Sequence, residues 1–308
     1  MDEFELIRTY FVRKGEAAGV TTGIGDDGAV LQPDPGRELI AVVDTLVQGV
    51  HFPDGTDPFD IAYRAVAVNL SDIAAMGGRP RWMTLALTLP ANNNEWLARF
   101  AEGLHSAAAQ YDVALVGGDT TSGKYLVVTV QVIGDVATGR AMQRRGAKVG
   151  DSIYVTGTLG DAAAGLELVA AGSPHTYLST RFLRPEARVI FGQQLVGAAS
   201  AAIDVSDGLF ADLSKLLEAS KVGGILYLES LPISDALRQE YDAAQRRQLA
   251  LSGGDDYEIC FTADPDIDLP AGDVQVTRIG MVVAGDALVC HLDGELVPYS
   301  DSGYRHFE

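Results

Sequence analysis

The chain has few cysteines and no stretch that resembles a membrane segment. Only two of its 308 residues are cysteine, Cys260 and Cys290, and each lies in a short apolar run. Two buried thiols in a reducing compartment fit this pattern better than a disulfide. No apolar run is long enough to span a bilayer, and the N-terminal stretch is charged and amphipathic. We therefore expect a cytoplasmic protein with no membrane partner.

Positive charge is also scarce. The chain carries 23 lysines and arginines against 42 aspartates and glutamates, a formal net charge of −19. Nucleic acids and anionic membranes both require a basic surface, so neither is an expected partner. The five histidines form no His-x-x-x-His pair and the cysteines form no cluster, which argues against a zinc site.

The hydrophobic periodicity predicts a mixed α/β fold with two domains. A basic, glycine-containing stretch at 137–151 interrupts the pattern, which places the domains at 1–139 and 140–308. Helices are expected at 2–14, 57–76, 94–111, 161–172, 186–199 and 209–220. Strands are expected on both sides of a Pro-Asp-Pro-Gly turn within 29–44, and at 81–90, 113–118, 125–134, 152–157, 224–230, 256–263, 274–284 and 287–292.

Two glycine-rich stretches match nucleotide-binding patterns by letter but not by context. Residues 23–30, GIGDDGAV, fit G-x-G-x-x-G, and residues 118–125, GDTTSGKY, fit the start of a P-loop. The first leads into two prolines, so no helix can begin there to bind a pyrophosphate. In the second, Tyr125 stands where a P-loop requires Ser or Thr, and a β-branched run follows. We therefore interpret neither stretch as a Rossmann turn or a P-loop.

Aspartates recur instead in Gly-, Ser- and Thr-containing turns beside apolar runs. Each of them alone is commonly a backbone cap, so the hypothesis of a shared site depends on the whole set. Asp72 differs because it lies in a nearly apolar helix, where its charge needs a partner such as Arg64 or a backbone group. The set in turns is Asp26, Asp27, Asp44, Asp119, Asp204, Asp207, Asp255 and Asp256.

The chemistry of this set favours Mg²⁺. Like charges gather only around a counter-charge, and an all-oxygen ligand set suits Mg²⁺ bound together with substrate phosphates. Ca²⁺ is the alternative, although the chain has no EF-hand loop. The carboxylates of GIGDDGAV would then recognise phosphate through bridging metal ions, and an acidic protein could bind a polyphosphate because the metal reverses the local charge.

Seven motifs follow one another along the chain: GIGDDGAV, VVDTLVQGVHF, AVNLSDIAAMGGRPRWMTLALTLP, GGDTT, GAKVGDSIYVTGTLGD, AIDVSDGL and LSGGDDYEICF. In order and spacing, and over nearly the whole length of the chain, they resemble the motifs of thiamine-monophosphate kinases. The wider superfamily includes aminoimidazole ribonucleotide synthetase, selenophosphate synthetase and a hydrogenase-maturation protein. The resemblance implies an N-terminal sheet domain that binds ATP and Mg²⁺ and forms a homodimer, and a C-terminal α/β domain that closes over the nucleotide.

The resemblance also implies a role for individual residues. The implied Mg²⁺ ligands are Asp27, Asp44, Asp72, Asp119, Asp204 and Asp207. The implied ATP contacts are Gly118, Asp119, Arg144 and Ser206. The implied contacts to thiamine monophosphate are His51, Asp255 and Tyr304. Together they imply that carboxylates from both halves of the chain meet in one cleft.

Two positions depart from the family pattern. Val42 and Val43 stand where the family usually has hydroxyl residues before the aspartate of VVD, so only backbone carbonyls could bind metal there. Asp255 stands where the family usually has Glu, which shortens its reach to the substrate by one methylene group.

The implied reaction transfers the γ-phosphoryl group of ATP to the phosphate of thiamine monophosphate. An acceptor phosphate is already largely deprotonated at neutral pH, so no residue is assigned as a general base. For His51 we favour a hydrogen bond to the substrate, and Arg145 is an alternative to Arg144. Two other functions remain open: another ATP-dependent enzyme of the superfamily, or a non-enzymatic acidic protein that binds divalent metal.

Overall fold

The computed structural model describes residues 3–12, 17–173 and 175–299. Its internal contacts divide the chain into two compact units. Unit 1 comprises residues 1–73 and 78–139, and unit 2 comprises residues 74–77 and 140–308. The division between Gly139 and Arg140 falls within the basic, glycine-containing stretch.

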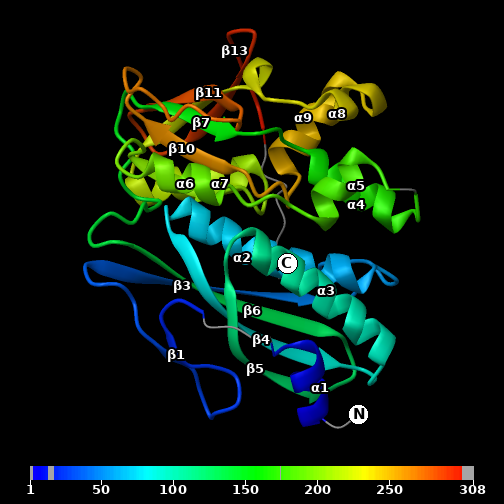
Figure 1. Cartoon of the computed structure of the whole chain (residues 1–308). Coiled ribbons are helices and arrows are strands. Elements are labelled where there is room, and N and C mark those ends of the chain that lie inside the picture. The colour runs from blue at the N-terminus through cyan, green and yellow to red at the C-terminus, as the bar shows by residue number, and fades with distance from the viewer. Residues whose placement is uncertain (1–2, 13–16, 174, 300–308) are drawn as a thin grey trace. The chain divides into compact units, whose positions relative to one another are not determined.

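Unit 1 is built on a four-stranded sheet in the order β3-β6-β4-β5 (Figure 1). β6 pairs antiparallel with both β3 and β4, whereas β4 and β5 are parallel. A separate antiparallel pair, β1 and β2, flanks the GIGDDGAV loop. The bounds are β1 Val20–Thr22, β2 Val30–Leu31, β3 Arg37–Val47, β4 Arg79–Leu89, β5 Ala114–Ser122 and β6 Val127–Ala137.

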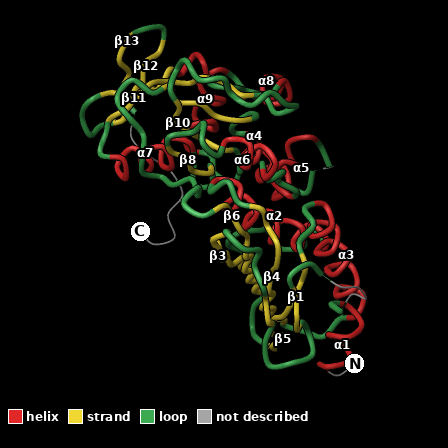
Figure 2. The backbone as a smooth tube through the Cα atoms, turned by 60° about the vertical axis from the view of Figure 1, so that its left-hand side comes forward, coloured by secondary structure: helices red, strands yellow, loops and turns green. Residues whose placement is uncertain are grey.

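Two long helices, α2 (Pro58–Ala75) and α3 (Asn94–Gln110), cover one face of this sheet (Figures 1 and 2). α2 begins where Asp57 accepts a hydrogen bond from the Phe59 backbone N–H at 2.8 Å, and Pro58 occupies its first position. The helices approach closely because residue 103 is glycine: a Cβ there would lie 2.1 Å from the Phe59 carbonyl oxygen. A short helix, α1 (Glu3–Tyr10), packs against α3.

The two faces of β3 differ sharply in exposure. Ile40 and Leu46 point toward the helices and are buried, and Asp44 belongs to the same alternating set. On the opposite face Leu39 is 53% exposed and Val43 is 59% exposed. β3 thus presents an apolar outer surface within the described part of the chain.

Unit 2 contains a seven-stranded sheet in the order β13-β12-β9-β11-β7-β10-β8. Its strands are β7 Ser152–Thr156, β8 Ala201–Asp204, β9 Gly223–Tyr227, β10 Ile259–Ala263, β11 Val276–Val283, β12 Leu288–Leu292 and β13 Glu295–Val297. Its helices are α4 Asp161–Ala170, α5 Tyr177–Leu183, α6 Val189–Leu195, α7 Leu209–Ser220, α8 Asp235–Glu240 and α9 Ala243–Ser252, with a 3₁₀ turn at Leu228–Ser230. α7 packs on the sheet beside β8, β9 and β12, and its buried leucines join Ile153, Ile203 and Cys260 in one core.

The structure confirms the mixed α/β fold and the long helices, but it differs from the sequence prediction in several elements. β5 continues four residues beyond the predicted end at 118, and α6 is shorter than the predicted helix 186–199. β2 and β3 do not pair with each other; β2 pairs with β1 and β3 with β6. The helices α5, α8 and α9 were missed because short helices give little periodic signal. No helix in the described ranges is long and apolar enough to cross a bilayer.

Candidate active site

Two of the predicted metal ligands, Asp44 and Asp72, meet in unit 1. Asp44 lies on β3 and Asp72 in the last turn of α2, on the helix that covers this face of the sheet. Their carboxyl groups are hydrogen-bonded to each other, and burial raises the pKa of the Asp44 carboxyl. Two carboxylates this close must share a proton or a cation.

This pair fits a hard divalent cation. Both donors are carboxylate oxygens, which is the ligand type that Mg²⁺ prefers, and both side chains are only partly buried. A cation here would replace the shared proton as counter-charge.

The other predicted ligands of unit 1 do not join this pair. Asp119 lies on β5, and β3 and β5 are the two edges of the sheet, so three strand spacings of about 4.8 Å, roughly 14 Å, separate it from Asp44. Asp27 is exposed in the loop between β1 and β2, where its backbone N–H donates to Asp26 at 2.8 Å. Over the described residues, no three His, Cys, Asp or Glu side chains come close enough together to hold a metal.

His51 lies in the turn directly after β3. Its Nδ1 accepts a hydrogen bond from the Val47 backbone N–H at 3.0 Å. A neutral ring with Nδ1 acting as acceptor carries its proton on Nε2, so Nε2 is a donor. This geometry suits a hydrogen bond to an anionic oxygen and leaves no free ring nitrogen for a general base.

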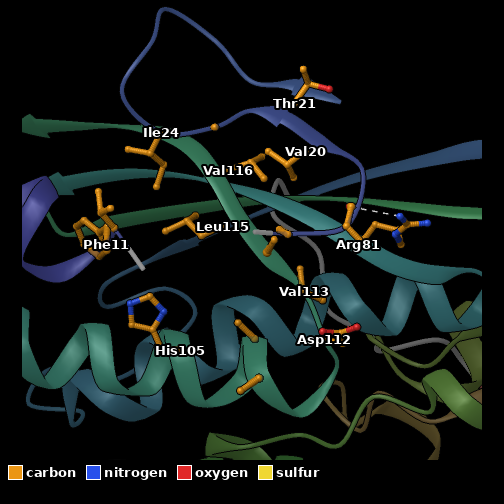
Figure 3. Close-up of a pocket in the computed structure, with 17 residues that line it drawn as sticks. Phe11, Val20, Thr21, Ile24, Arg81, His105, Asp112, Val113, Leu115 and Val116 are labelled. Carbon is orange, nitrogen blue, oxygen red and sulfur yellow. Dashed lines mark hydrogen bonds between the residues drawn. The ribbon is translucent and has the colours of Figure 1, made fainter. Parts of the chain in front are cut away.

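Beside the first half of β5 lies a cavity of about 870 Å³, which the sequence did not reveal (Figure 3). Its walls come from residues 17–24, the end of α3 and the start of β5, and they expose both polar and apolar atoms, with Leu115 and Val116 among the apolar side chains. Thr21, Arg81, His105 and Asp112 contribute its polar side chains. The run of small residues in SAAAQYDVA, which leaves this space open, was the available sequence signal.

Gly118 follows that cavity along β5. A Cβ at this position would lie 2.0 Å from the Leu85 carbonyl oxygen on β4. Only glycine therefore permits the local approach of β5 to β4, and it leaves the backbone at Gly118 uncovered.

In unit 2, Asp204, Ser206 and Asp207 lie at the junction of β8 and α7. Asp204 ends the strand and is buried, whereas Asp207 is partly exposed. Asp212, in the first turn of α7, accepts the backbone N–H groups of Ser206 at 2.9 Å and Asp207 at 2.8 Å. One turn later Lys215 donates to both Asp207 and Asp212. The sequence had not singled out Asp212 or Lys215.

The segment that carries Asp255 is fastened to the same junction. The Asp255 N–H donates to the Ser206 carbonyl, and the Tyr257 N–H donates to the Val205 carbonyl, both at 2.8 Å. Asp255 and Tyr257 adopt left-handed backbone conformations, with φ of 71° and 51°. Two such non-glycine residues carry strain that the surrounding contacts must offset, a feature that clusters at functional sites.

Between these two residues Asp256 points into the interior. Its carboxyl group accepts the Gly160 N–H at 2.7 Å and the Ala162 N–H at 3.2 Å, at the start of α4. Burial raises the pKa of Asp256 to about 8. The sequence pattern predicted Asp256 as one of the aspartates in turns, but the structure gives it a buried position in which it anchors the start of α4.

Glu258 is fully buried between two arginines. It accepts hydrogen bonds from Arg181 at 2.7 Å, from Arg188 at 2.7 Å through each of two nitrogens, and from Thr156 at 2.6 Å. Burial alone would raise the pKa of Glu258, but the hydrogen bond and charge of Arg188, with the charge of Arg181, hold it below the usual value. This network, which sequence reasoning missed, fixes the strand that follows Asp255.

Of the remaining predicted residues, Arg144 is exposed and its carbonyl accepts the Ser220 hydroxyl at 3.0 Å. The side chain of its alternative, Arg145, donates to Gln143 at 2.5 Å. Tyr304 lies outside the described residues.

Comparison with known proteins follows the division of the chain. The family described as AIR synthase related protein, N-terminal domain, matches residues 25–136, and the corresponding C-terminal domain family matches residues 148–292.

Individual relatives cover almost the whole chain. The thiamine-monophosphate kinase of Escherichia coli K12 is 46% identical over 99% of this chain and 98% of its own length. The crystal structure of the thiamine-monophosphate kinase from Stenotrophomonas maltophilia superimposes with a TM-score of 0.84 at 45% identity, covering 91% of this chain and 93% of that one. The solved structure named AaThiL complexed with AMPPCP and TMP has a TM-score of 0.81 at 34% identity and covers 92% of each chain.

Proposed function

Because the chain belongs to the family of thiamine-monophosphate kinases, we propose that it transfers the γ-phosphoryl group of ATP to the phosphate of thiamine monophosphate. The products are thiamine diphosphate and ADP. The observation that carries the chemistry is the Asp44–Asp72 pair, two hydrogen-bonded carboxyl groups that suit a divalent cation. A relative with an ATP analogue and TMP in its name supports the choice of substrates.

The acceptor needs no strong general base. A phosphate monoester has a second pKa near 6 and is largely dianionic at neutral pH. The barrier arises mainly from bringing two anions together in line, so catalysis requires charge neutralisation and positioning. Mg²⁺, when bound, supplies positive charge at the phosphate oxygens.

We assign the residues to three tasks. Asp44 and Asp72 hold Mg²⁺, and Asp27, Asp119, Asp204 and Asp207 are the further metal ligands. Gly118, Asp119, Arg144 and Ser206 contact ATP. His51, Asp255 and Tyr304 contact thiamine monophosphate.

The nucleotide base has a candidate location in unit 1. The cavity beside β5 has the size of small-molecule sites and offers both apolar and polar groups, and it adjoins Gly118 along the strand. We place the adenosine part of ATP there, because the uncovered backbone at Gly118 lets the phosphates continue along β5.

His51 and Asp255 contact the phosphate acceptor, thiamine monophosphate. Nε2 of His51 donates a hydrogen bond to the phosphate of thiamine monophosphate, since Nδ1 is already occupied by Val47. Thiamine carries a cationic ring, which a carboxylate such as Asp255 and an aromatic side chain such as Tyr304 can stabilise. The strained backbone at Asp255 supports a functional role for this position.

We also propose that the protein acts in the cytoplasm as a homodimer joined through the outer face of the unit 1 sheet. The exposed Leu39 and Val43 on β3 support this surface. In such a dimer β3 of one copy would lie beside β5 of the other, so the edge strand that carries Asp119 would adjoin the edge strand that carries Asp44 in its partner. This arrangement explains why one chain holds these ligands on opposite edges of its sheet.

An ADP-release assay with purified protein, ATP and Mg²⁺ tests the proposal. We expect ADP formation that depends on thiamine monophosphate and stops with EDTA. ADP release that is indifferent to thiamine monophosphate would indicate another ATP-dependent enzyme of the superfamily. A third outcome would indicate a non-enzymatic metal-binding protein: no ADP is released, Mg²⁺ raises the thermal stability, and ATP added with Mg²⁺ raises it no further.

A further inference from the structure

The ammonium group of Lys215 forms an ion pair with the carboxylate of Asp207. Nζ lies 2.5 Å from Asp207 Oδ2 and 2.8 Å from Asp212 Oδ1. Lys215 follows Asp212 by one helical turn of α7, and Asp207 lies in the loop just before that helix, where its backbone N–H donates to Asp212. The carboxylate that the proposed function uses as a metal ligand is thus paired with a cationic side chain of the protein itself.

The loop that carries Asp207 does not need Lys215 to keep its shape. Asp212 Oδ2 accepts the N–H groups of Ser206 and Asp207, while Lys215 uses the other oxygen, Oδ1. Removing the ammonium group would therefore leave both backbone hydrogen bonds in place. The contact to Asp207 is the one that a metal ion would have to replace.

The pair is also exposed enough to exchange. The side chain of Lys215 is 41% exposed and that of Asp207 is 37% exposed. A partly exposed ion pair contributes little free energy, so a divalent cation with higher charge can displace it at a modest cost. A buried pair, such as that of Glu258 with Arg181, would not exchange in this way.

We propose that Lys215 is a built-in counter-ion of Asp207 that weakens divalent-cation binding at this carboxylate and leaves it when the cation binds. The inference rests on the proposed function, because it takes Asp207 as a metal ligand. It adds a residue of this chain that tunes the metal affinity of the junction between β8 and α7. Lys215 keeps its bond to Asp212 in the metal-bound state, which holds the ammonium group close to the loop.

Mn²⁺ binding, followed by the EPR signal of the free ion, tests this without any turnover. Four proteins are compared: the unaltered chain, Lys215→Met, Asp207→Asn and the double variant. We expect Asp207→Asn to weaken or remove one site, and Lys215→Met to tighten that site by roughly two- to fivefold, the range of a partly exposed ion pair. In the double variant the gain disappears, because Lys215 acts through Asp207.

Lys221→Met is the matched control, because it removes the same charge at the exposed C-terminal end of the same helix. A gain in Lys221→Met as large as that in Lys215→Met would overturn the inference, and so would unchanged or weaker Mn²⁺ binding in Lys215→Met. It also fails if Asp207→Asn leaves every site intact. In that case the kinase activity can still stand, since the ADP-release assay measures it independently.

Discussion

At the scale of single residues, two hydrogen bonds of unit 1 support the roles that we propose for Asp44, Asp72 and His51. The carboxyl groups of Asp44 and Asp72 share a hydrogen bond, and the Val47 N–H occupies Nδ1 of His51. The first contact creates a place for a cation, and the second turns His51 into a hydrogen-bond donor. Both residues were predicted from sequence motifs, but the roles follow from partners that the motifs do not specify.

Asp44→Asn and Asp72→Asn should each lower kcat by roughly 10²–10³-fold, because each removes one charge that holds the cation at the reacting phosphates. The Mg²⁺ concentration needed for half-maximal activity should rise. Steady-state kinetics over a Mg²⁺ series measures both quantities. Asp286→Asn, a change at an exposed position of unit 2, is the control and should have no effect. Wild-type Mg²⁺ dependence in both active-site variants would exclude the pair as a metal site.

His51→Asn should raise KM for thiamine monophosphate by roughly 10–100-fold, the value of one hydrogen bond to a charged group, with little change in kcat. Kinetics at several pH values test this. If the variant instead loses an ionisation from the pH profile of kcat, then His51 is a base and the base-free mechanism is wrong.

At the scale of elements, backbone hydrogen bonds bring together the segments of unit 2 that carry the proposed site residues. The junction between β8 and α7 and the segment before β10 are joined through the Ser206 and Val205 carbonyls. The Glu258 network with Arg181 and Arg188 anchors β10 beneath Asp255. The position of Asp255, a predicted substrate contact, therefore depends on buried charged residues to which no ligand contact is assigned.

Glu258→Gln should lower the free energy of unfolding at pH 7 by about 3–5 kcal/mol, because it leaves Arg181 and Arg188 without their buried counter-charge. A carboxylate with a lowered pKa stabilises the fold above its ordinary pKa of about 4.3, and this contribution is lost as the pH falls through the lower folded value. The difference between the two proteins should thus be complete at pH 7 and shrink below about pH 4. Urea unfolding across this range measures it, and an equal difference at all pH values would contradict the ionised pair.

At the scale of the whole molecule, the sheet of unit 1 keeps two of the proposed metal ligands apart. Asp44 and Asp119 occupy opposite edge strands, and the outer face of β3 carries exposed Leu39 and Val43. A second copy is the simplest partner for this face, because one two-fold axis joins both edges at once. The proposed dimer would bring together the two edge strands that lie apart in a single chain.

A mixture of two inactive variants tests this arrangement. Asp44→Asn and Asp119→Asn should each be nearly inactive alone. After equal amounts are unfolded and refolded together, half of the dimers are mixed and each mixed dimer has one intact site, so about a quarter of wild-type activity should return. Val43→Glu should abolish this recovery and give a particle with the 32.6-kDa mass of one chain in sedimentation. No recovery from a mixture that does form mixed dimers would place each site within one chain.

The sequence by itself determined the mixed α/β fold, the long helices and the family. These depend on periodic burial and on motifs that are local along the chain, such as the helix signal from Asp57 to Gly77. Short helices such as α5 and α8 escaped, because two turns contain too few residues to show a period.

Only the tertiary structure decided which of the predicted carboxylates meet. Asp44 and Asp72 come together because α2 crosses the face of β3, whereas Asp119 is separated by the strand order β3-β6-β4-β5. The same holds for the Lys215 contact to Asp207 and for the cavity beside β5. Distance between side chains depends on how strands are ordered and helices packed, and residues far apart in the sequence carry no local signal of that order.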